Sequence, residues 1–494
     1  MFFVYILDVP RLYHNKLYKI EVSDLMERIK YLSDSELQRI DQASRALLWE
    51  VGVEVACEEP LEYYEKAGCT VDWKNKRVRI PDDVISKTLS MCQSYVRLYD
   101  RRGNPPLVIG GDDVYFGAVG IATNVLDFET DTFRSVVEQD LIDIIQLADV
   151  LERPHYQWPF ATPTDVPSSI SDLIETKHLL LNSTKHVVAE AQNTENCRKT
   201  YEICAAIAGG MDKFLEKPFL TMQVTLTSPL HFRKDAGELT IEVAKLGAPL
   251  FVESGPMAGG TGPATLAGSL ICANAELLNT FVLAKAVNPS VPLIYASWAR
   301  LLDMRGATCS HGGPEFAMLR MGTTQLAKYY GLPSGGGCVL GDSKSIDMQL
   351  GMEKMGSALL PALAGTNMCC GMGLFADENA ISMEALLVDN EITGWVEHVM
   401  KGIRVDKETC DISIFKEVGP GGDFVRTKHT MDNYKRESFL PTIMDRGYLA
   451  IDKDPYAKTM HKRTKKLYQK LMKDYKKPDI PEEIVKKIDE IIAR

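Results

Sequence analysis

The sequence lacks the short signatures that identify several common enzyme classes. It contains no G-x-S-x-G segment, which argues against a serine hydrolase of the nucleophile-elbow type. No G-x-G-x-x-G segment follows the first strand candidate, which argues against a dinucleotide-binding sheet. Its eleven cysteines form no C-x-x-C pair and no H-x-C spacing, so a zinc site is disfavoured. These absences disfavour hydrolase, dinucleotide and zinc chemistry, and we expect no tightly bound metal.

The chain also lacks an excess of positive charge and a long apolar run. Its formal net charge is −11, which argues against nucleic acid as the main partner. The basic stretch 458–477 is a local exception, either a solvated C-terminal helix or a docking patch for an acidic protein. No apolar run approaches the ~18 residues of a membrane helix. The opening MFFVYIL has no positive leading segment or cleavage site, so we expect an N-terminal strand or packing arm. Reduced thiols and a cytoplasmic location without a membrane follow as expectations.

Short apolar segments alternate with helix-length segments from about residue 112 onwards. Such β-then-α repetition predicts a (β/α)8 TIM barrel of class α/β, with a doubly wound sheet as the rival. We expect three parts: an N-terminal helical/β extension (1–111), the catalytic barrel (112–405) and a C-terminal helical extension (406–494). In the first part, Ser33 and Glu36 form a capping box that predicts a helix start. The eight predicted strands are 113–120, 156–163, 186–191, 219–229, 248–256, 292–299, 333–340 and 367–373.

Aromatic and charged residues gather at the carboxyl ends of these predicted strands, where barrel enzymes hold their active sites. Aromatic faces bind quaternary ammonium groups, and an Arg or His can pair with a carboxylate on the same ligand. The combination points to a zwitterionic ligand, although ordinary core packing explains any single aromatic residue. The candidates are Phe116, Trp158, Phe160, Tyr295 and Trp298 for the ammonium, carboxylates at Glu190, Glu253 and Asp342, and Arg300 and His311 for an acidic tail.

Three consecutive glycines, Gly335, Gly336 and Gly337, fall on the seventh predicted strand. Glycine leaves space above the backbone and weakens a strand. In a closed barrel this run could leave a hollow that a bulky ligand or a cofactor edge approaches, and a β-bulge or barrel corner is the alternative. A Cys/His zinc site is also conceivable, although buried cysteines are usually small apolar residues. Its ligands would be Cys338, Cys369, Cys370 and His311.

Several longer segments together resemble the trimethylamine methyltransferase family of corrinoid-dependent methyltransferases. The segments are SGPMAGGTGPATLAGSLICANAELL, GGPE (312–315), KYYGLPSGGGCVLGDSK, EKMGSALLPALAGTNMCCGMG and SMEALLVDNEI (382–392). The resemblance covers nearly the whole chain. It implies a (β/α)8 barrel that transfers a methyl group to the Co(I) corrinoid (cobalamin) of a separate corrinoid protein, so the cofactor is borrowed and not resident.

The chain departs from the founding family members at Leu340. Those enzymes carry pyrrolysine one residue before the segment that matches Gly341-Asp342-Ser343-Lys344. The resemblance is therefore to the branch without pyrrolysine, which demethylates quaternary amines such as glycine betaine. It implies that Leu340 lines the pocket at the pyrrolysine position. It also implies that Gly335, Gly336, Gly337 and Asp342 lie on the side where the corrinoid approaches.

The resulting prediction is a methyltransferase acting on a quaternary amine such as glycine betaine, proline betaine or carnitine, by in-line displacement. The leaving group is a neutral tertiary amine, so the reaction needs positioning and exclusion of water more than a protein nucleophile. Two alternatives stay open: a barrel enzyme acting on another methylated compound, and a betaine-binding protein without turnover. A docked corrinoid protein and a homo-oligomer are expected.

Overall fold

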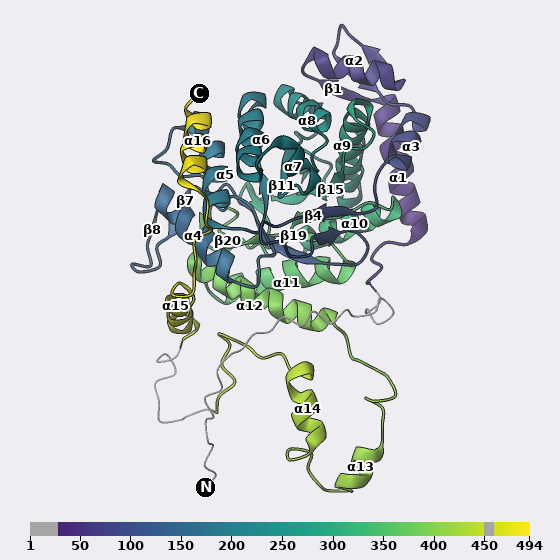
Figure 1. Cartoon of the computed structure of the whole chain (residues 1–494). Helices are drawn as coiled ribbons and strands as arrows, with labels where there is room; N and C mark the ends of the chain where they lie inside the picture. The colour runs from purple at the N-terminus through teal and green to yellow at the C-terminus, as the bar shows by residue number, and fades with distance from the viewer. Residues whose placement is uncertain (1–27, 449–458) are drawn as a thin grey trace.

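Eight parallel strands close into a barrel at the centre of the molecule (Figure 1). The structure is a computed structural model that describes residues 28–448 and 459–494. The strands follow one another around the barrel in chain order, which confirms the predicted TIM barrel, and each predicted segment supplies one of them. They are β6 (Tyr115–Ala118), β9 (Tyr156–Gln157), β10 (His186–Ala189), β11 (Leu220–Thr225), β13 (Leu250–Ser254), β15 (Leu293–Ser297), β18 (Ser334–Gly337) and β19 (Met368–Met372).

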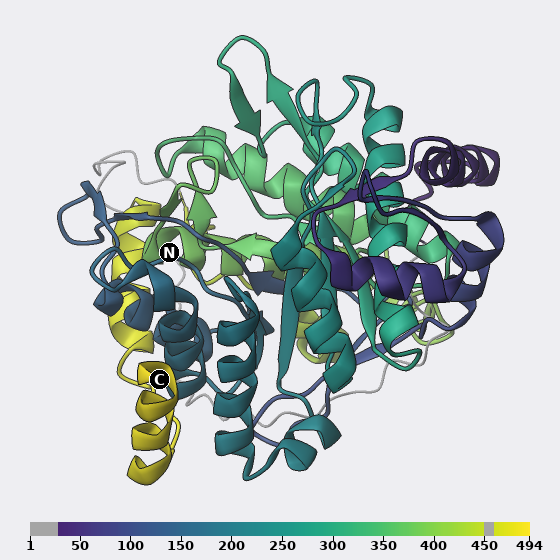
Figure 2. The same cartoon turned by 90° about the horizontal axis from the view of Figure 1, so that it is seen from above.

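Helices surround this barrel and bury the outer faces of its strands (Figure 2). Because both faces of a parallel sheet are buried, the strands are almost wholly apolar or small. The main helices are α4 (Glu138–Val150), α5 (Ser171–Asn182), α6 (Thr194–Ala208), α8 (Lys234–Leu246), α9 (Leu266–Val287), α10 (Pro314–Tyr329), α11 (Met348–Ala364) and α12 (Met383–Met400), with the short α7 (Met211–Glu216) and η2 (Ser168–Ile170) between them.

Small antiparallel hairpins are inserted between several barrel strands and their helices. They follow the carboxyl ends of the strands and therefore build the mouth of the barrel. The inserted strands are β7 (Asn124–Leu126) and β8 (Phe133–Ser135), β16 (Arg300–Asp303) and β17 (Thr308–Ser310), and β20 (Leu374–Phe375) and β21 (Ala380–Ile381). The short strand β14 (Met257–Ala258) pairs with β16, while β12 (His231–Phe232) lies outside these hairpins.

An N-terminal extension of short helices and strands packs beside α9. The capping box is confirmed: Glu36 N donates to Ser33 Oγ at 3.4 Å, and Ser33 N donates to Glu36 Oε2 at 2.8 Å. The extension comprises α1 (Asp34–Glu50), β1 (Val53–Val55), α2 (Glu58–Ala67), β2 (Thr70–Asp72), β3 (Arg77–Arg79), α3 (Asp82–Ser90), β4 (Val96–Leu98) and β5 (Leu107–Ile109).

The helix α9 corrects the expectation that no segment of the chain is long and apolar enough for a membrane helix. Within the described residues it is the one helix long and apolar enough to cross a membrane, and 78% of its apolar window is buried in the protein. Its neighbours are the helices α1, α2, α3, α8 and α10. A helix buried in the core of a protein can meet the same criteria of length and composition as a membrane-spanning helix.

The C-terminal extension leaves the barrel and later returns to it. It contains α13 (Ser413–Val418), α14 (Lys428–Glu437), α15 (Met460–Leu471) and α16 (Glu482–Ala493). The helix α15 rests on the start of α12, where His461 Nδ1 lies 2.6 Å from Glu384 Oε2. The basic stretch falls mainly on α15, although Lys458 lies outside the described residues, as does the opening MFFVYIL. The three predicted part boundaries stay predictions.

Candidate active site at the barrel mouth

The strand register decides which predicted side chains point into the barrel. A Cβ atom at Gly335 would lie 2.5 Å from the ring of Phe251 on β13, so this position faces inward. A Cβ atom at Gly336 would lie 2.9 Å from Arg320 on the surrounding helix α10, so that position faces outward. Residues paired across neighbouring strands share a face. Whether the side chain of a paired residue points into the barrel or towards the helices therefore follows from its pairing with these two positions.

Two predicted aromatic residues lie on the outer face of the barrel. Phe116 pairs with Cys369, which pairs with the outward position Gly336. Tyr295 precedes the inward position Ala296 and donates from its hydroxyl to Asn274 Oδ1 of α9 at 2.8 Å. The one-residue alternation of a strand turns both side chains away from the barrel interior. We therefore leave both out of the binding site.

Two indole rings and one phenyl ring lie at the inner side of the mouth. Trp158 packs edge-on against Phe251, with ring centroids 5.0 Å apart. Trp298 follows β15 and donates from Nε1 to Glu378 Oε1 at 2.8 Å. Phe160 lies further out, where its ring packs against Gly373 beside Ile144 of α4. Phe251 was not singled out in the sequence, since an apolar residue within a strand carries no functional signal.

Carboxylates from different strands converge beside these rings. Glu253 shares its face with the inward residue Ala296 and accepts a hydrogen bond from Gln223. Burial raises the pKa of Glu253 to about 8, and the charges of Glu190 and Glu378 add to this effect. Burial also raises the pKa of Glu190 to about 7, while the Trp158 indole opposes the shift. Such raised values are typical of buried carboxylates that lie beside one another, an arrangement common at functional sites.

Glu378 and its neighbour Asp377 are functional candidates that the sequence did not reveal. They occupy the turn between β20 and β21, where Ala376, Asp377 and Glu378 have φ values of 54°, 58° and 62°. Non-glycine residues rarely adopt this left-handed conformation, and each costs about 1–2 kcal/mol. Strain of this kind gathers at functional sites. The usable signal is a pair of acids in the turn that follows β20, shortly after the last barrel strand.

His311 and Asp342 join two mouth loops. Asp342 accepts hydrogen bonds from His311 N and Ser310 Oγ, both at 2.8 Å. His311 Nδ1 lies 2.6 Å from Asp377 Oδ1, and its buried Nε2 lies 3.4 Å from Glu378 Oε2 without making a hydrogen bond within the described residues. Potential ligand atoms of His311, Asp342 and Asp377 all lie within 4.8 Å of one another. Because hydrogen bonds already join these three residues, we assign them to positioning the loops and not to a metal.

Two arginines supply positive charge beside the carboxylates. Arg320 is fully buried, donates to the carbonyl oxygens of Gly337 and Ala299, and has its pKa lowered by burial to about 10. Arg300 is partly exposed; it donates from Nη1 to Trp298 O at 3.2 Å. Within residues 28–448 and 459–494, neither guanidinium lies within ion-pair distance of a carboxylate. Arg300 is therefore available to an acidic group of a ligand.

The triple glycine does not leave a hollow, which corrects the sequence expectation. A Cβ atom at Gly335 would collide with Phe251, and one at Gly337 would lie 2.7 Å from Phe316 and 2.8 Å from Trp298. At Gly336 it would lie 2.3 Å from the carbonyl oxygen of Ser297, and φ is 153°. The space above the glycines is filled by the protein's own large side chains. A direct contact between these glycines and a corrinoid stays a prediction without support from this geometry.

Leu340 is fully buried beside the last barrel strand. A Cβ atom at Gly371 would lie 2.9 Å from Leu340 Cγ, so the Leu340 side chain packs closely against this strand. Its backbone is held by Ser357 of α11, whose hydroxyl donates to Leu340 O at 2.8 Å and accepts from Leu340 N at 3.1 Å. The position is thus rigidly fixed, and its role in lining a pocket stays a prediction.

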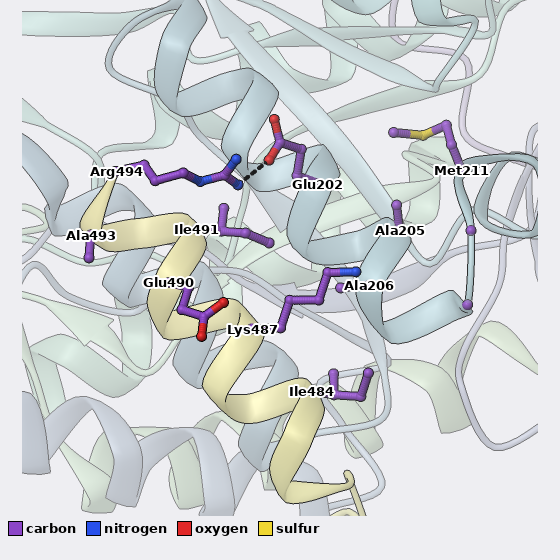
Figure 3. A pocket seen from close by; sticks show the side chains of 12 residues that line it. Glu202, Ala205, Ala206, Met211, Ile484, Lys487, Glu490, Ile491, Ala493 and Arg494 are labelled. Carbon is purple, nitrogen blue, oxygen red and sulfur yellow. Dashed lines mark hydrogen bonds and ion pairs between the residues drawn. The ribbon is translucent and has the colours of Figure 1, made fainter.

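A separate groove lies between α6 and α16, away from the mouth (Figure 3). Its volume is about 1030 Å³, and Arg494 bonds Glu202 at one end. Ala205 and Ile491 contribute to its mostly apolar lining, which contains no aromatic ring. A site that must hold a cation against aromatic faces does not fit this groove.

Comparisons with known proteins show the family to which the chain belongs. Residues 13–494 match the family described as Trimethylamine methyltransferase (MTTB). A glycine betaine methyltransferase of Desulfitobacterium hafniense (strain Y51) is 32% identical over 478 residues, covering 96% of this chain and 98% of that protein. A trimethylamine methyltransferase MttB of Desulfitobacterium hafniense (strain DSM 10664 / DCB-2) is 30% identical, covering 93% of this chain and 92% of that protein.

A solved structure supports the fold independently. The crystal structure of the hydroxylamine MtmB complex superposes with a TM-score of 0.52 at 11% identity, covering 91% of this chain and 89% of that one. At this identity the likeness concerns the fold alone. Taken with the sequence matches over nearly the full length, it leads to one conclusion: the chain belongs to the trimethylamine methyltransferase (MTTB) family and is a methyltransferase.

Proposed function

We propose that this methyltransferase removes a methyl group from a betaine-type quaternary amine and passes it to the Co(I) corrinoid of a separate protein. The observation that carries the proposal is the charge arrangement at the mouth. Glu190, Glu253 and Glu378 gather beside two indole rings, while Arg300 stands without a carboxylate partner among the described residues. This is the complement of a zwitterion with a cationic nitrogen and an acidic tail.

The carboxylates suit a permanent cation better than a neutral amine. A quaternary nitrogen has no N–H to donate, so it is stabilised by nearby negative charge and by the faces of Trp158 and Trp298. Leu340 offers no polar group that could activate a tertiary amine. A quaternary ammonium needs no such group, because its C–N electron pair leaves with a neutral tertiary amine. These points favour a quaternary amine over trimethylamine.

The chain's residues act by holding and enclosing the substrate. The Glu253 carboxylate and the indoles would fix the ammonium, and Arg300 would pair with its carboxylate tail. Only 5% of the surface of Trp298 is exposed, so the enclosed nitrogen would be shielded from water. No proton has to move during the transfer. A corrinoid carried by the partner protein would supply the electron pair for the new bond to the methyl carbon.

The mouth loops also fit a docked corrinoid protein. Two loops that follow barrel strands, and the first turns of α11, expose large apolar side chains: Ile121, Met304, Met348 and Met352. Met348 is 87% exposed at the start of α11. Methionines at an exposed rim form adaptable contacts with partner proteins. Since the space above the triple glycine is filled, these rim residues are the better candidates for contact with the corrinoid protein.

The proposal is tested by binding and transfer measurements on the same protein. Calorimetry with glycine betaine, proline betaine, carnitine, choline and trimethylamine should show tightest binding for one of the three betaines. The preferred betaine should then methylate a Co(I) corrinoid, which is followed by its change in absorption. Binding without transfer would show a betaine-binding protein, and transfer from trimethylamine alone would refute the quaternary assignment.

A variant at Arg300 tests binding of the carboxylate end of the substrate separately from binding of its ammonium end. Replacement of Arg300 by Gln should weaken betaine binding about tenfold to hundredfold, because a charge-assisted bond to the tail is lost. Choline has the same ammonium group and no carboxylate, so its weaker binding should stay unchanged. Equal losses for both ligands would contradict the role of Arg300.

A further inference from the structure

A lysine and an aspartate behind the last two barrel strands form a fully buried ion pair. Lys354 of α11 donates from Nζ to Asp389 Oδ2 of α12 at 2.6 Å, and each side chain has at most 1% of its surface exposed. The two helices lie side by side at the outside of the barrel (Figure 1). Burial raises the pKa of Asp389 and lowers that of Lys354, while their mutual attraction opposes both shifts. Stability alone does not explain such a pair, because apolar residues of similar volume often replace buried ion pairs without loss.

The Asp389 carboxylate also holds the backbone at the end of the last barrel strand. Gly373 N donates to Asp389 Oδ2 at 2.7 Å, directly before the hairpin of β20 and β21 begins. Gly373 O accepts from Ser382 N at 3.2 Å, directly after that hairpin ends. Asp389 Oδ1 has no hydrogen-bond partner within the described residues, so the side chain acts through Oδ2 alone. Asp389 therefore fixes the base of the hairpin through one backbone hydrogen bond.

This hairpin carries Glu378 into the barrel mouth, where the carboxylate accepts the indole N–H of Trp298. Its two strands share only two residue pairs. Two-stranded hairpins are at best marginally stable by themselves. The position of Glu378 therefore depends on what holds the hairpin at its base and at its turn.

The turn of the hairpin has a second anchor, which also leads back to α11. Ala376 N donates to Ser343 O at 3.1 Å. Ser343 N in turn donates to Glu353 Oε2 at 3.0 Å. The adjacent α11 residues Glu353 and Lys354 thus support the turn and the base of the same hairpin, each through one further residue.

We infer that Asp389 is a positioning residue for the Glu378 carboxylate, and that Lys354 supplies the charge that allows an aspartate at this buried place. An ionised carboxylate accepts the Gly373 N–H in a charge-assisted hydrogen bond, which is stronger than a neutral one. Without this bond the base of the hairpin is released, and Glu378 is no longer held beside Trp298. The predicted effect on betaine binding rests on the proposed function, whereas the position of the hairpin is tested without substrate.

Two double variants distinguish the hydrogen bond from the charge pair. The acceptor-free variant, Lys354→Met with Asp389→Leu, removes both charges and the acceptor of the Gly373 N–H. The acceptor-retaining variant, Lys354→Met with Asp389→Asn, also removes both charges, but its side-chain amide oxygen can accept that N–H. Neither variant leaves a buried charge without a partner, so both are expected to fold. If the acceptor-free variant does not fold, the smaller replacement Lys354→Met with Asp389→Ala gives the same comparison.

Hydrogen exchange of residues 373–382, measured on the full chain without substrate, tests the position of the hairpin. The acceptor-free variant should exchange about tenfold faster than the wild type, because one buried hydrogen bond is lost. The acceptor-retaining variant should exchange within about threefold of the wild type. Wild-type exchange in the acceptor-free variant, or equally fast exchange in both variants, would overturn the inference.

Betaine binding then tests the link from the hairpin to Glu378. The acceptor-free variant should raise KM for the preferred betaine about tenfold with kcat changed less than about twofold, and the acceptor-retaining variant should restore KM. The control Lys285→Met removes a buried lysine of α9 that bonds Val291 O at 2.9 Å, and it should change neither exchange of residues 373–382 nor KM. Faster exchange with unchanged KM would refute the role of Asp389 in positioning Glu378. A wild type that binds no betaine, with exchange as predicted, would refute the proposed function and still support the anchoring of the hairpin by Asp389.

Discussion

The affinity of the protein for a betaine should rise steeply with pH, and Glu253 should account for most of the rise. A cation binds best when the surrounding carboxylates are ionised. The pKa of Glu190 is raised to about 7 and that of Glu253 to about 8. At pH 7 about half of Glu190 and about a tenth of Glu253 are ionised, so both are ionised in about one molecule in twenty. At pH 9 both are ionised in about nine molecules in ten, which predicts roughly twentyfold tighter binding.

The raised carboxylate pKa values also make the stability of the protein depend on pH. The folded protein holds the proton of Glu253 more tightly than the unfolded chain does, because the pKa is raised on folding. This difference stabilises the ligand-free protein fully below about pH 4.5, and the stabilisation is lost as the pH rises towards 8. A bound betaine should offset that loss. The rise in melting temperature caused by the ligand should therefore be largest at pH 9 and smallest at pH 6.

Calorimetry at pH 6 to 9 in buffers of different ionisation enthalpy measures both the affinity and the protons released. In the variant Glu253→Gln, the change in affinity between pH 7 and 9 should shrink to about twofold, because only Glu190 still titrates. The control Asp113→Asn removes a carboxylate at the opposite end of the barrel and should keep the full effect. Affinity that is independent of pH, or that falls as pH rises, would refute the carboxylate cluster as the cation site.

Two further predictions concern the packing around Gly336 and the exposed methionines at the barrel mouth. Replacement of Gly336 by Ala should lower the free energy of unfolding by about 2–4 kcal/mol in denaturant titrations, because the added methyl meets Ser297 O at a positive φ. Replacement of Gly351 by Ala, which adds a methyl to a helix where nothing lies within 4 Å, should be neutral or slightly stabilising; equal effects at both sites would contradict the packing argument. The double variant Met348→Asp and Met352→Asp should raise KM for the corrinoid protein at least about tenfold with unchanged betaine affinity, and an unchanged KM would remove the rim from the docking surface.

The mouth of the barrel shows how much of the candidate site could be predicted from the sequence. The predicted ends of the strands brought Trp158, Glu190, Glu253 and Trp298 to one region, because parallel strands all end on the same side. Trp298 was named for its ring, yet its indole N–H also holds Glu378. The pair of acids is visible in the sequence, but the turn that aims Glu378 into the mouth is not, since no propensity rule predicts consecutive non-glycine residues with positive φ.

The sequence by itself determined the barrel, because eight apolar segments separated by helix-length spacers have essentially one closed parallel arrangement. Tertiary structure alone decided which face each residue occupies. A shift of one residue turns a strand side chain from the interior to the helices, as it does for Phe116 and Tyr295. It also decided that the glycines make room for Phe251, Arg320 and Trp298, which come from other elements of the chain. Contacts between distant segments depend on the packing of whole elements, and no local pattern encodes them.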